Sequence, residues 1–273
     1  MFRKKNNIMK EYELVESAAW TDFFRSASRE TIAKCGIKTF PVGGVIGTIA
    51  SKIDILAFNR VVGLGIKEPI DERIIDIILN KIEANGVKRF FIQIHPEVYS
   101  DQLRRLLVSH DFYHYNNWVR LVRDNSSATN MKTNLVIEKI SKSESKSLAG
   151  IVVKAFSWPN ELMDWIASTV ERKNWHHYMA FEKDIPVGTA AFYHSGEFAW
   201  FDFAATHPDF RGKGAQSALL VRRIEDCREL GVKTIIVETA EQTSEKEVPS
   251  YRNVLKTGFK EEYKRPNYIF VKK

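Results

Sequence analysis

Residues 206–220 read Thr-His-Pro-Asp-Phe-Arg-Gly-Lys-Gly-Ala-Gln-Ser-Ala-Leu-Leu, and this stretch decides how the rest of the chain is interpreted. Apolar residues 198–205 precede it and the amphipathic residues 216–230 follow it, so the pattern predicts a strand, a tight turn and a helix. Glycines let the backbone of such a turn approach a ligand closely, and the unpaired amides of the first helical turn attract an anion. Arg211 and Lys213 add positive charge beside these amides. The stretch therefore predicts a site for a diphosphate.

Two other phosphate-binding patterns do not fit this stretch. A Walker A loop needs Gly, four residues, Gly and then Lys-Ser/Thr, and the sequence contains no such string. The dinucleotide fingerprint needs a third glycine three positions after the second, and Ser217 stands there. An ordinary surface turn before a helix is the remaining alternative. The succession of strand, turn and helix favours phosphate binding over it.

Length and composition limit the class of protein. The 273 residues are enough for two domains of ordinary size, and 44% hydrophobic with 27% charged residues is a soluble globular profile. No apolar run approaches the ~20 residues that span a membrane, and the basic N-terminus lacks the apolar core of a secretion signal. We therefore expect a cytoplasmic protein without a membrane partner.

Cysteines and net charge limit the ligands. Cys35 and Cys227 are far apart and have no metal-ligand spacing, so neither a disulfide framework nor a metal is expected. The net charge of +7 allows for nucleic acid, but Lys and Arg are interspersed with Asp and Glu and form no basic stripe. We expect a solvated surface and no nucleic-acid partner.

A polar stretch without periodicity, residues 124–130, divides the chain near its middle. We expect a linker at residues 125–133 between a domain of residues 1–124 and a domain of residues 134–273. The C-terminal half is predicted to contain a strand at 132–140, helices at 144–155 and 161–172, a hairpin of 178–182 and 186–194, a strand at 198–206, a helix at 216–230, a strand at 232–239, a helix at 250–257 and a closing strand at 268–272.

The N-terminal half repeats this order of elements. The pattern predicts a strand at 53–66, a helix at 71–84, a strand at 87–94, a helix at 100–109 and a strand at 117–122. Between its first strand and first helix, residues 67–72 contain no glycine and carry acids. Like charge at that place opposes phosphate binding, so we expect no diphosphate site in this half.

The glycine-rich stretch resembles the coenzyme A loop of the GNAT superfamily, the acetyl-CoA-dependent N-acetyltransferases. The family pattern is Arg or Gln, two residues, Gly, one residue, then Gly or Ala. Arg211 and Gly214 match it, and Gln216 departs from the small last residue. Residues 175–181 and the string from 249 to Gly258-Phe259 also resemble one bacterial branch of the superfamily.

The resemblance covers about residues 134–271 and implies an α/β fold, with a mixed, twisted sheet and helices on both faces. With the repeated order of elements, it implies two GNAT-like domains in tandem, of which the N-terminal one is degenerate. An unrelated α/β domain is the alternative for the N-terminal half.

The resemblance also implies acetyl-CoA as cosubstrate and no metal. Small side chains on the strand before the loop would let a pantetheine arm lie along it, and backbone N–H groups there would hold the oxyanion. The cofactor-binding positions that it implies are Ala204, Ala205, Thr206, Arg211, Gly212, Lys213, Gly214, Ala215, Gln216 and Asn253.

Acyl transfer to an amine needs an acid for the departing thiolate. The family often uses a tyrosine at a position where this sequence has Val254, and Tyr251 lies one helical turn earlier on the same face. Tyr251 is therefore a candidate acid, and a partly buried packing tyrosine is the alternative.

The same reaction needs a base that deprotonates the amine. Asp202 lies in an aromatic strand and Glu238 ends an apolar one, where acids are costly unless they are paired or used. Both are candidate bases, and an ion pair would explain either. His176 and His177 are a third option, because histidine titrates near neutral pH.

We expect an enzyme that transfers acetyl from acetyl-CoA to a primary amine by direct attack. The acceptor is a small-molecule or peptide amine, and the oligomeric state is open. A non-catalytic acyl-CoA-binding or sensing protein is the first alternative, because the usual tyrosine is absent. A nucleic-acid-associated protein is the second, and only the net charge suggests it.

Overall fold

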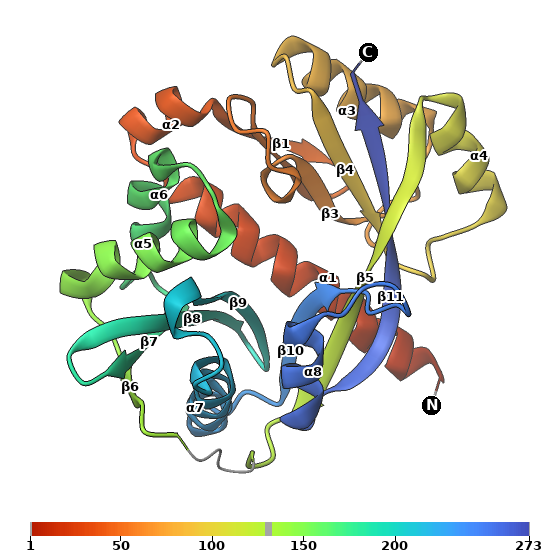
Figure 1. Ribbon diagram of the computed structural model, residues 1–273. Coiled ribbons are helices and arrows are strands. Elements are labelled where there is room, and N and C mark those ends of the chain that lie inside the picture. Colours follow the sequence, from red (N-terminus) through yellow and green to blue (C-terminus); the bar gives the residue numbers. More distant parts are fainter. Residues whose placement is uncertain (1, 129–132, 273) are drawn as a thin grey trace. The chain divides into compact units, whose positions relative to one another are not determined.

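The computed structural model describes residues 2–128 and 133–272, and Figure 1 shows its elements. The chain divides into two compact units: unit 1 comprises Met1–Val119 with Tyr263–Lys273, and unit 2 comprises Arg120–Glu262. Along the sequence, one order of elements occurs twice, namely two helices, three strands, a helix, a strand, a helix and a strand. This repetition and the mixed sheet confirm the predicted α/β class.

The first repeat runs from the N-terminus to strand β5. Its elements are α1 (Phe2–Arg25), α2 (Arg29–Cys35), β1 (Ile37–Val42), β2 (Val45–Ala50), η1 (Leu56–Phe58), β3 (Arg60–Leu64), α3 (Glu72–Ala84), β4 (Arg89–Ile94), α4 (Asp101–Ser109) and β5 (Phe112–Asp124). Side chains cap three of its helices: Ser28 caps α2, Asp71 caps α3 and Ser100 caps α4.

The sheet of unit 1 has the strand order β1-β2-β3-β4-β11. Strands β1, β2 and β3 are antiparallel neighbours, whereas β3 and β4 are parallel. The core lies where α3 and α4 pack on this sheet. Its members include Ile74, Ile78 and Ile82 of α3, which recur on one helical face as the sequence pattern predicts.

The short strand β6 (Val136–Lys139) precedes the second repeat. The elements of the repeat are η2 (Lys142–Glu144), α5 (Ser145–Phe156), η3 (Asn160–Leu162), α6 (Met163–Ala167), β7 (Trp175–Glu182), β8 (Ile185–Ser195), β9 (Phe198–Thr206), η4 (Pro208–Phe210), α7 (Ala215–Glu229), β10 (Thr234–Ala240), α8 (Pro249–Lys256) and β11 (Lys260–Val271). The strand order in unit 2 is β5-β10-β9-β8-β7-β6, and both α5 and α7 pack against β8 and β9.

Several predicted elements are wrong in extent. Strand β5 begins at Phe112 and not at 117, and β11 begins at Lys260 and not at 268. Two other differences have a local cause. The strand predicted at 53–66 is a turn, the short helix η1 and strand β3, because the Asn59 side chain bonds Ala50 N (2.9 Å) and Ile53 O (3.0 Å) and holds the chain in a bend. The helix predicted at 161–172 ends at Ala167. There the Ser168 hydroxyl donates to Trp165 O at 2.6 Å and competes with continuation of the helix.

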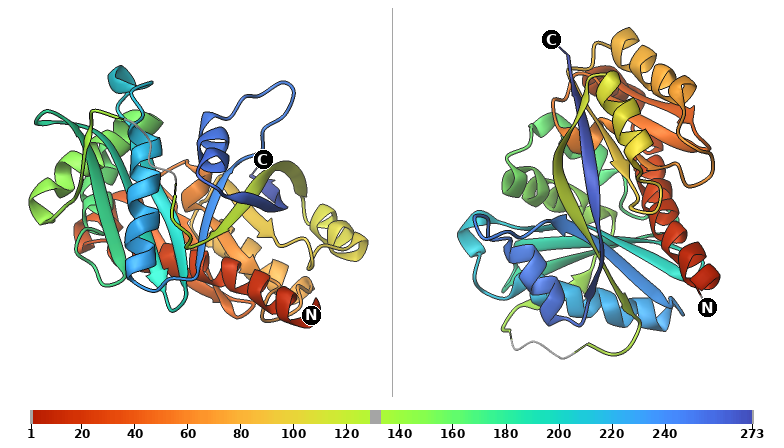
Figure 2. Two further views of the ribbon diagram at one scale, coloured as in Figure 1. Left: turned by 90° about the horizontal axis from the view of Figure 1, so that it is seen from below. Right: turned by 90° about the vertical axis from the view of Figure 1, so that its right-hand side faces the viewer.

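The last strand returns to unit 1. Figure 2 shows β11 as one continuous strand from α8 to the C-terminus, and its second part pairs antiparallel with β4, with Tyr268 opposite Ile92. Unit 2 therefore ends at Glu262, whereas the sequence pattern assigned this strand to the domain of residues 134–273. Unit 2 also begins inside β5, at Arg120. The predicted linker lies partly outside the described residues, because 129–132 are not among them.

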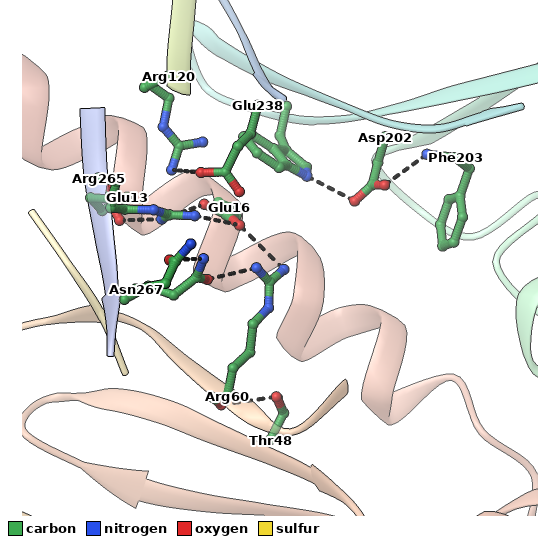
Figure 3. Close-up of polar contacts among 12 residues, drawn as sticks. Glu13, Glu16, Thr48, Arg60, Arg120, Asp202, Phe203, Glu238, Arg265 and Asn267 are labelled. Atoms are coloured by element: carbon green, nitrogen blue, oxygen red, sulfur yellow. Dashed lines mark hydrogen bonds and ion pairs between the residues drawn. The ribbon is translucent and has the colours of Figure 1, made fainter. Parts of the chain in front are cut away.

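A buried ionic cluster holds this strand in unit 1 (Figure 3). Arg265 of β11 bonds Glu13 at 2.6 Å and Glu16 at 2.8 Å, both on α1. Arg60 of β3 lies 3.3 Å from Glu16, and the Tyr263 hydroxyl donates to Glu13 at 2.6 Å. All five side chains are buried, so two carboxylates balance two guanidiniums inside the unit. The cluster fastens the first helix to the last strand.

Candidate functional site

Strands β9 and β10 diverge in the middle of the sheet of unit 2. Their parallel pairing runs from Phe198 opposite Thr234 to Trp200 opposite Ile236. Strand β9 then continues to Thr206 and β10 to Ala240. The register in which β9 pairs with β10 thus ends at Trp200, and we call the segment of β9 and β10 beyond it the opening.

A bulge interrupts β9 inside this opening. Asp202 lies opposite Ala191 and Ala205 opposite Thr189, so two residues of β9, Phe203 and Ala204, correspond to one residue of β8. Phe203 has a φ of 47°, in the left-handed region that non-glycine residues avoid. Its ring is buried, whereas Ala204 is exposed.

The register decides which backbone groups face the opening. His207 N donates to Val187 O at 2.9 Å, so these two residues form a hydrogen-bonded pair of the β8–β9 ladder. Such pairs alternate in an antiparallel ladder, so Ala205 directs its N–H and C=O toward β8 and Thr206 directs its own away from β8. Of the predicted oxyanion donors, Ala205 is therefore engaged with β8.

Helix α7 begins directly after the loop and, among the residues that the structure describes, no side chain caps it. Gly214 is its N-cap residue, with a φ of 83°, and Gly212 has the same φ. A Cβ on Gly212 would meet no atom within 4 Å, so the space beside the loop is open. The first-turn amides have no partner within the helix, and they lie at the positive end of the helix dipole.

Cationic side chains flank this helix start. Arg211 and Lys213 are exposed, and the Lys213 ammonium lies 2.7 Å from a carboxylate oxygen of Glu182 and 5.0 Å from the centre of the Phe210 ring. Thr133 donates to Lys213 O at 3.2 Å. The loop thus combines amides, glycines and two cations, as the sequence predicts for an anion site.

Gln216 has a role that the sequence did not reveal. Its side-chain nitrogen donates to Ala205 O at 2.7 Å and lies 3.0 Å from Thr206 Oγ1. The side chain therefore points onto β9 and ties the first turn of α7 to the end of that strand. A larger residue is accommodated where the family pattern has a small one, because its side chain lies against the sheet.

The two candidate bases belong to one chain of contacts (Figure 3). A Glu238 carboxylate oxygen lies 3.6 Å from the guanidinium of Arg120, and both side chains are almost fully buried. Arg120 also lies 4.7 Å from the centre of the Trp200 ring. The Trp200 indole donates to Asp202 at 3.0 Å, and Phe203 N donates to the other Asp202 oxygen at 2.7 Å. Glu238 and Asp202 are thus linked through Arg120 and Trp200.

Among the residues that link Glu238 to Asp202, Arg120 is the one that sequence reasoning missed. It is the first residue of unit 2, although it lies on the last strand of the first repeat. The available signal was a cation between apolar residues, in Val119-Arg120-Leu121, because a buried cation needs an acid and Glu238 follows the apolar residues of β10. The pattern names no partner, since the two residues are far apart in the sequence.

Helix α8 carries the remaining candidates. The Tyr251 hydroxyl donates to Glu261 at 2.9 Å, and its ring is partly exposed. Asn253 is also partly buried. Val254, at the position where the family often has tyrosine, is buried. Tyr251 is therefore half-buried, and its hydroxyl is engaged with a carboxylate.

The histidine pair is not brought to the opening between β9 and β10. Both residues lie on β7, and β8 separates that strand from β9. Burial lowers the pKa of His177 to about 3, and its ring bonds the Thr169 hydroxyl at 2.9 Å. Burial likewise lowers the pKa of His176 to about 4, and its ring stacks on Phe192. Both are neutral packing residues at pH 7.

The comparisons with known proteins agree with this geometry. The sequence model of the Acetyltransferase (GNAT) family matches residues 146–255, which include the opening, the loop and α7. A comparison with curated proteins finds no significant sequence match. Residues 146–255 are thus a GNAT-family domain.

Solved structures extend the likeness to most of the chain. A GCN5-related N-acetyltransferase from Kribbella flavida has a TM-score of 0.61 at 13% identity, over 86% of this chain and 89% of that one. One from Sphaerobacter thermophilus has a TM-score of 0.60 at 15% identity, over 73% of this chain and 67% of that one. A tandem GNAT protein from the clavulanic acid biosynthesis pathway has a TM-score of 0.54 at 11% identity, over 76% and 70%. The fold is that of these acetyltransferases, tandem members included.

Neither a membrane-spanning helix nor a metal-ligand group occurs in the part of the chain that the structure describes. Among the helices of the described residues, none has the length and apolar character that crossing a bilayer requires. Within the same residues, His, Cys, Asp and Glu side chains form no group of three or more that could hold a metal ion.

Proposed function

We propose that the protein transfers an acetyl group from acetyl-CoA to a primary amine of a small molecule or peptide, by direct attack of the amine. One observation carries the proposal. The start of α7 is flanked by glycines, and no side chain of the described residues caps it; it follows β9, whose pairing with β10 ends at Trp200, within the segment that matches the GNAT family.

The residues of the loop fit a diphosphate. The amides of residues 212–216 and the charges of Arg211 and Lys213 would hold it, because amides and cations converge there and the space beside Gly212 is open. The backbone of Ala204 and Thr206 would line the pantetheine arm, and Asn253 would contact it from α8. When bound, acetyl-CoA supplies an acyl group activated as a thioester.

Glu238 is the base in this proposal. An alkylamine with a pKa near 10.4 must lose a proton at neutral pH, which costs about 4–5 kcal/mol without a base. The guanidinium of Arg120, 3.6 Å away, favours the ionised form of the Glu238 carboxylate in its buried place. An ionised carboxylate beside the opening accepts the amine proton, directly or through water.

Tyr251 is the acid that protonates the departing thiolate. Its hydroxyl already donates to Glu261, so it must release that carboxylate when it donates to sulfur. This observation, with Val254 at the usual tyrosine position, also supports the second candidate function, an acyl-CoA-binding or sensing protein without turnover.

Calorimetry with CoA and a thiol-release assay with acetyl-CoA and a panel of amines distinguish the two functions. We expect CoA to bind and at least one amine to be acetylated. Tight binding without turnover of any amine would establish the sensor. The double variant Arg211→Ala/Gly214→Val should lose CoA binding while remaining folded, and retained binding would overturn the proposal.

The base is tested separately. Glu238→Gln should lower kcat at least about 100-fold with little change in CoA affinity, because the amide cannot accept the proton. Glu245→Gln, an exposed loop residue, is the control for loss of one negative charge. Equal kcat for Glu238→Gln and the wild type would exclude Glu238 as the base.

A further inference from the structure

We propose that Asp202 is a positioning residue: it holds the β9 bulge and thereby sets the path of the backbone from Ala204 to Thr206 along the opening. The inference rests on the proposed acetyl transfer, because that backbone would bind the thioester arm and its oxyanion. It assigns Asp202 a role other than that of a base.

The bulge needs support at Phe203. A left-handed phenylalanine is strained, because its Cβ crowds the neighbouring carbonyl oxygen, and such residues persist only where surrounding contacts determine them. Contacts of both the backbone and the ring support Phe203 in this conformation. Asp202 accepts the Phe203 N–H at 2.7 Å, and the buried Phe203 ring packs on Trp175 with centroids 5.6 Å apart.

Asp202 is itself held in place. The Trp200 indole donates to the oxygen that does not accept from Phe203 N, so donors hold both carboxylate oxygens. Trp200 is buried and lies under the Arg120 guanidinium, which pairs with Glu238. The carboxylate is thus fixed between an indole on one side and the strained backbone on the other.

These contacts favour positioning over proton transfer. The Trp200 indole and Phe203 N, both groups of the protein itself, donate to the two Asp202 oxygens, so the carboxylate holds these two groups in place. A base must also give its proton up to solvent after each turnover, whereas Asp202 directs its oxygens at Trp200 and the chain's own backbone. Figure 3 shows the two bonds of the Asp202 carboxylate as dashed lines, one of them to Phe203.

A double-mutant cycle tests the proposal. Asp202→Ala should lower kcat about 100-fold, the size of effect seen when one oxyanion donor is misplaced. In a Phe203→Gly background the same change should cost less than about 5-fold, because glycine adopts a positive φ without support. Asp202→Asn keeps an acceptor for Phe203 N and should retain kcat within about 10-fold of the wild type.

A base would behave differently in each case. Asp202→Asn would then be as inactive as Asp202→Ala, Phe203→Gly would not reduce the effect of Asp202→Ala, and the pH profile of kcat would lose its acidic limb. Any of these results would overturn the positioning role.

Amide hydrogen exchange of residues 198–206 gives a readout that needs no turnover. Asp202→Ala should speed exchange in this peptide at least about 10-fold, with exchange in α8 unchanged as an internal control of folding. Unchanged exchange would refute the inference even if acetyl transfer is confirmed. Faster exchange in a protein that acetylates no amine would refute the proposed function and leave the support of the bulge by Asp202 standing.

Discussion

Helices α3 and α7 occupy the same place in the two repeats, yet their N-cap residues differ. At α3, the Asp71 carboxylate accepts from Ile74 N at 2.9 Å. At α7, the equivalent residue is Gly214, and no side chain of the described residues caps the helix. A helix start that carries its own carboxylate has no place for an external anion. The comparison teaches that one residue at the N-cap separates a closed helix start from one suited to bind diphosphate.

The strands before these two helices also differ, in how far their pairing with the next parallel strand extends. Strand β3 also has an irregularity, between Val61 and Leu64, but its pairing with β4 resumes at Leu64 opposite Ile94. The pairing of β9 with β10 ends at Trp200. In unit 1 the corresponding strands, β3 and β4, therefore stay paired beyond the irregularity. The buried charged side chains of unit 1 pair with each other. We infer that unit 1 has a structural role.

The largest expected effect concerns that inference. Arg265→Met should lower the free energy of unfolding by about 3–5 kcal/mol, because two buried carboxylates, Glu13 and Glu16, lose their shared partner. Urea unfolding measures it. The exposed pair of Arg252 with Glu247 is the matched control, and Arg252→Met should cost less than about 1 kcal/mol. If Arg265→Met abolished CoA binding by folded protein, unit 1 would not be merely structural.

The next prediction concerns a variant in which α7 has an N-cap carboxylate, as α3 has. Gly214→Asp should weaken CoA binding at least about 100-fold, since the new carboxylate competes for the first-turn amides and repels the diphosphate. Calorimetry measures the change. Gly214→Ala carries the same strain at a φ of 83° without the charge, and Gly196→Asp places a carboxylate on another left-handed glycine away from the loop. Equal losses for Gly214→Ala and Gly214→Asp would leave strain alone as the cause.

The reverse change should not create a second site. Asp71→Ala should lower the free energy of unfolding by about 0.5–2 kcal/mol through loss of the cap, and Asp71→Asn should restore most of it. Neither variant should gain a second CoA site in calorimetry, because β3 and β4 remain paired beyond the bulge. A stoichiometry of two for Asp71→Ala would contradict this account of unit 1.

The smallest expected effect concerns the residue two positions after each N-cap, which is Gln216 in α7 and Arg73 in α3. Gln216→Ala should cost about 1 kcal/mol of stability, because its bonds to Ala205 and Thr206 are lost. Its counterpart on α3 is Arg73, which is exposed and lies 3.8–3.9 Å from Asp71 and Glu68. Arg73→Ala should therefore change stability by less than about 0.5 kcal/mol. Thermal unfolding of the two variants checks the difference. Equal shifts in Tm would show that the bonds of Gln216 to β9 do not stabilise the protein.

Elements with a local cause were predictable from the sequence. The helix over 71–84 follows from spaced isoleucines, and Asp71 at its start is the N-cap in the structure. The loop at 206–220 was found because glycines, cations and a helix start are neighbours in the chain. The N–H direction of Ala205 was not predictable, because it depends on the register with β8.

Features with a distant cause were not predictable. Arg120 meets Glu238, and Arg265 meets Glu13, across more than a hundred residues, and periodicity carries no information about such partners. The final strand has an ordinary strand pattern, so nothing local shows that it pairs with β4. The Gln216 side chain lies against β9 for the same reason: its direction is set by the strand beneath it.

The return of β11 to unit 1 has a consequence for biosynthesis. Strand β4 receives its antiparallel neighbour from residues 267–271, and Glu13 and Glu16 receive Arg265. During translation unit 1 therefore has a sheet edge and two acids exposed until residues 263–271 have been synthesised. Unit 2 needs no residue after Glu262, so on the ribosome the unit that is begun second has all of its residues before the unit that is begun first.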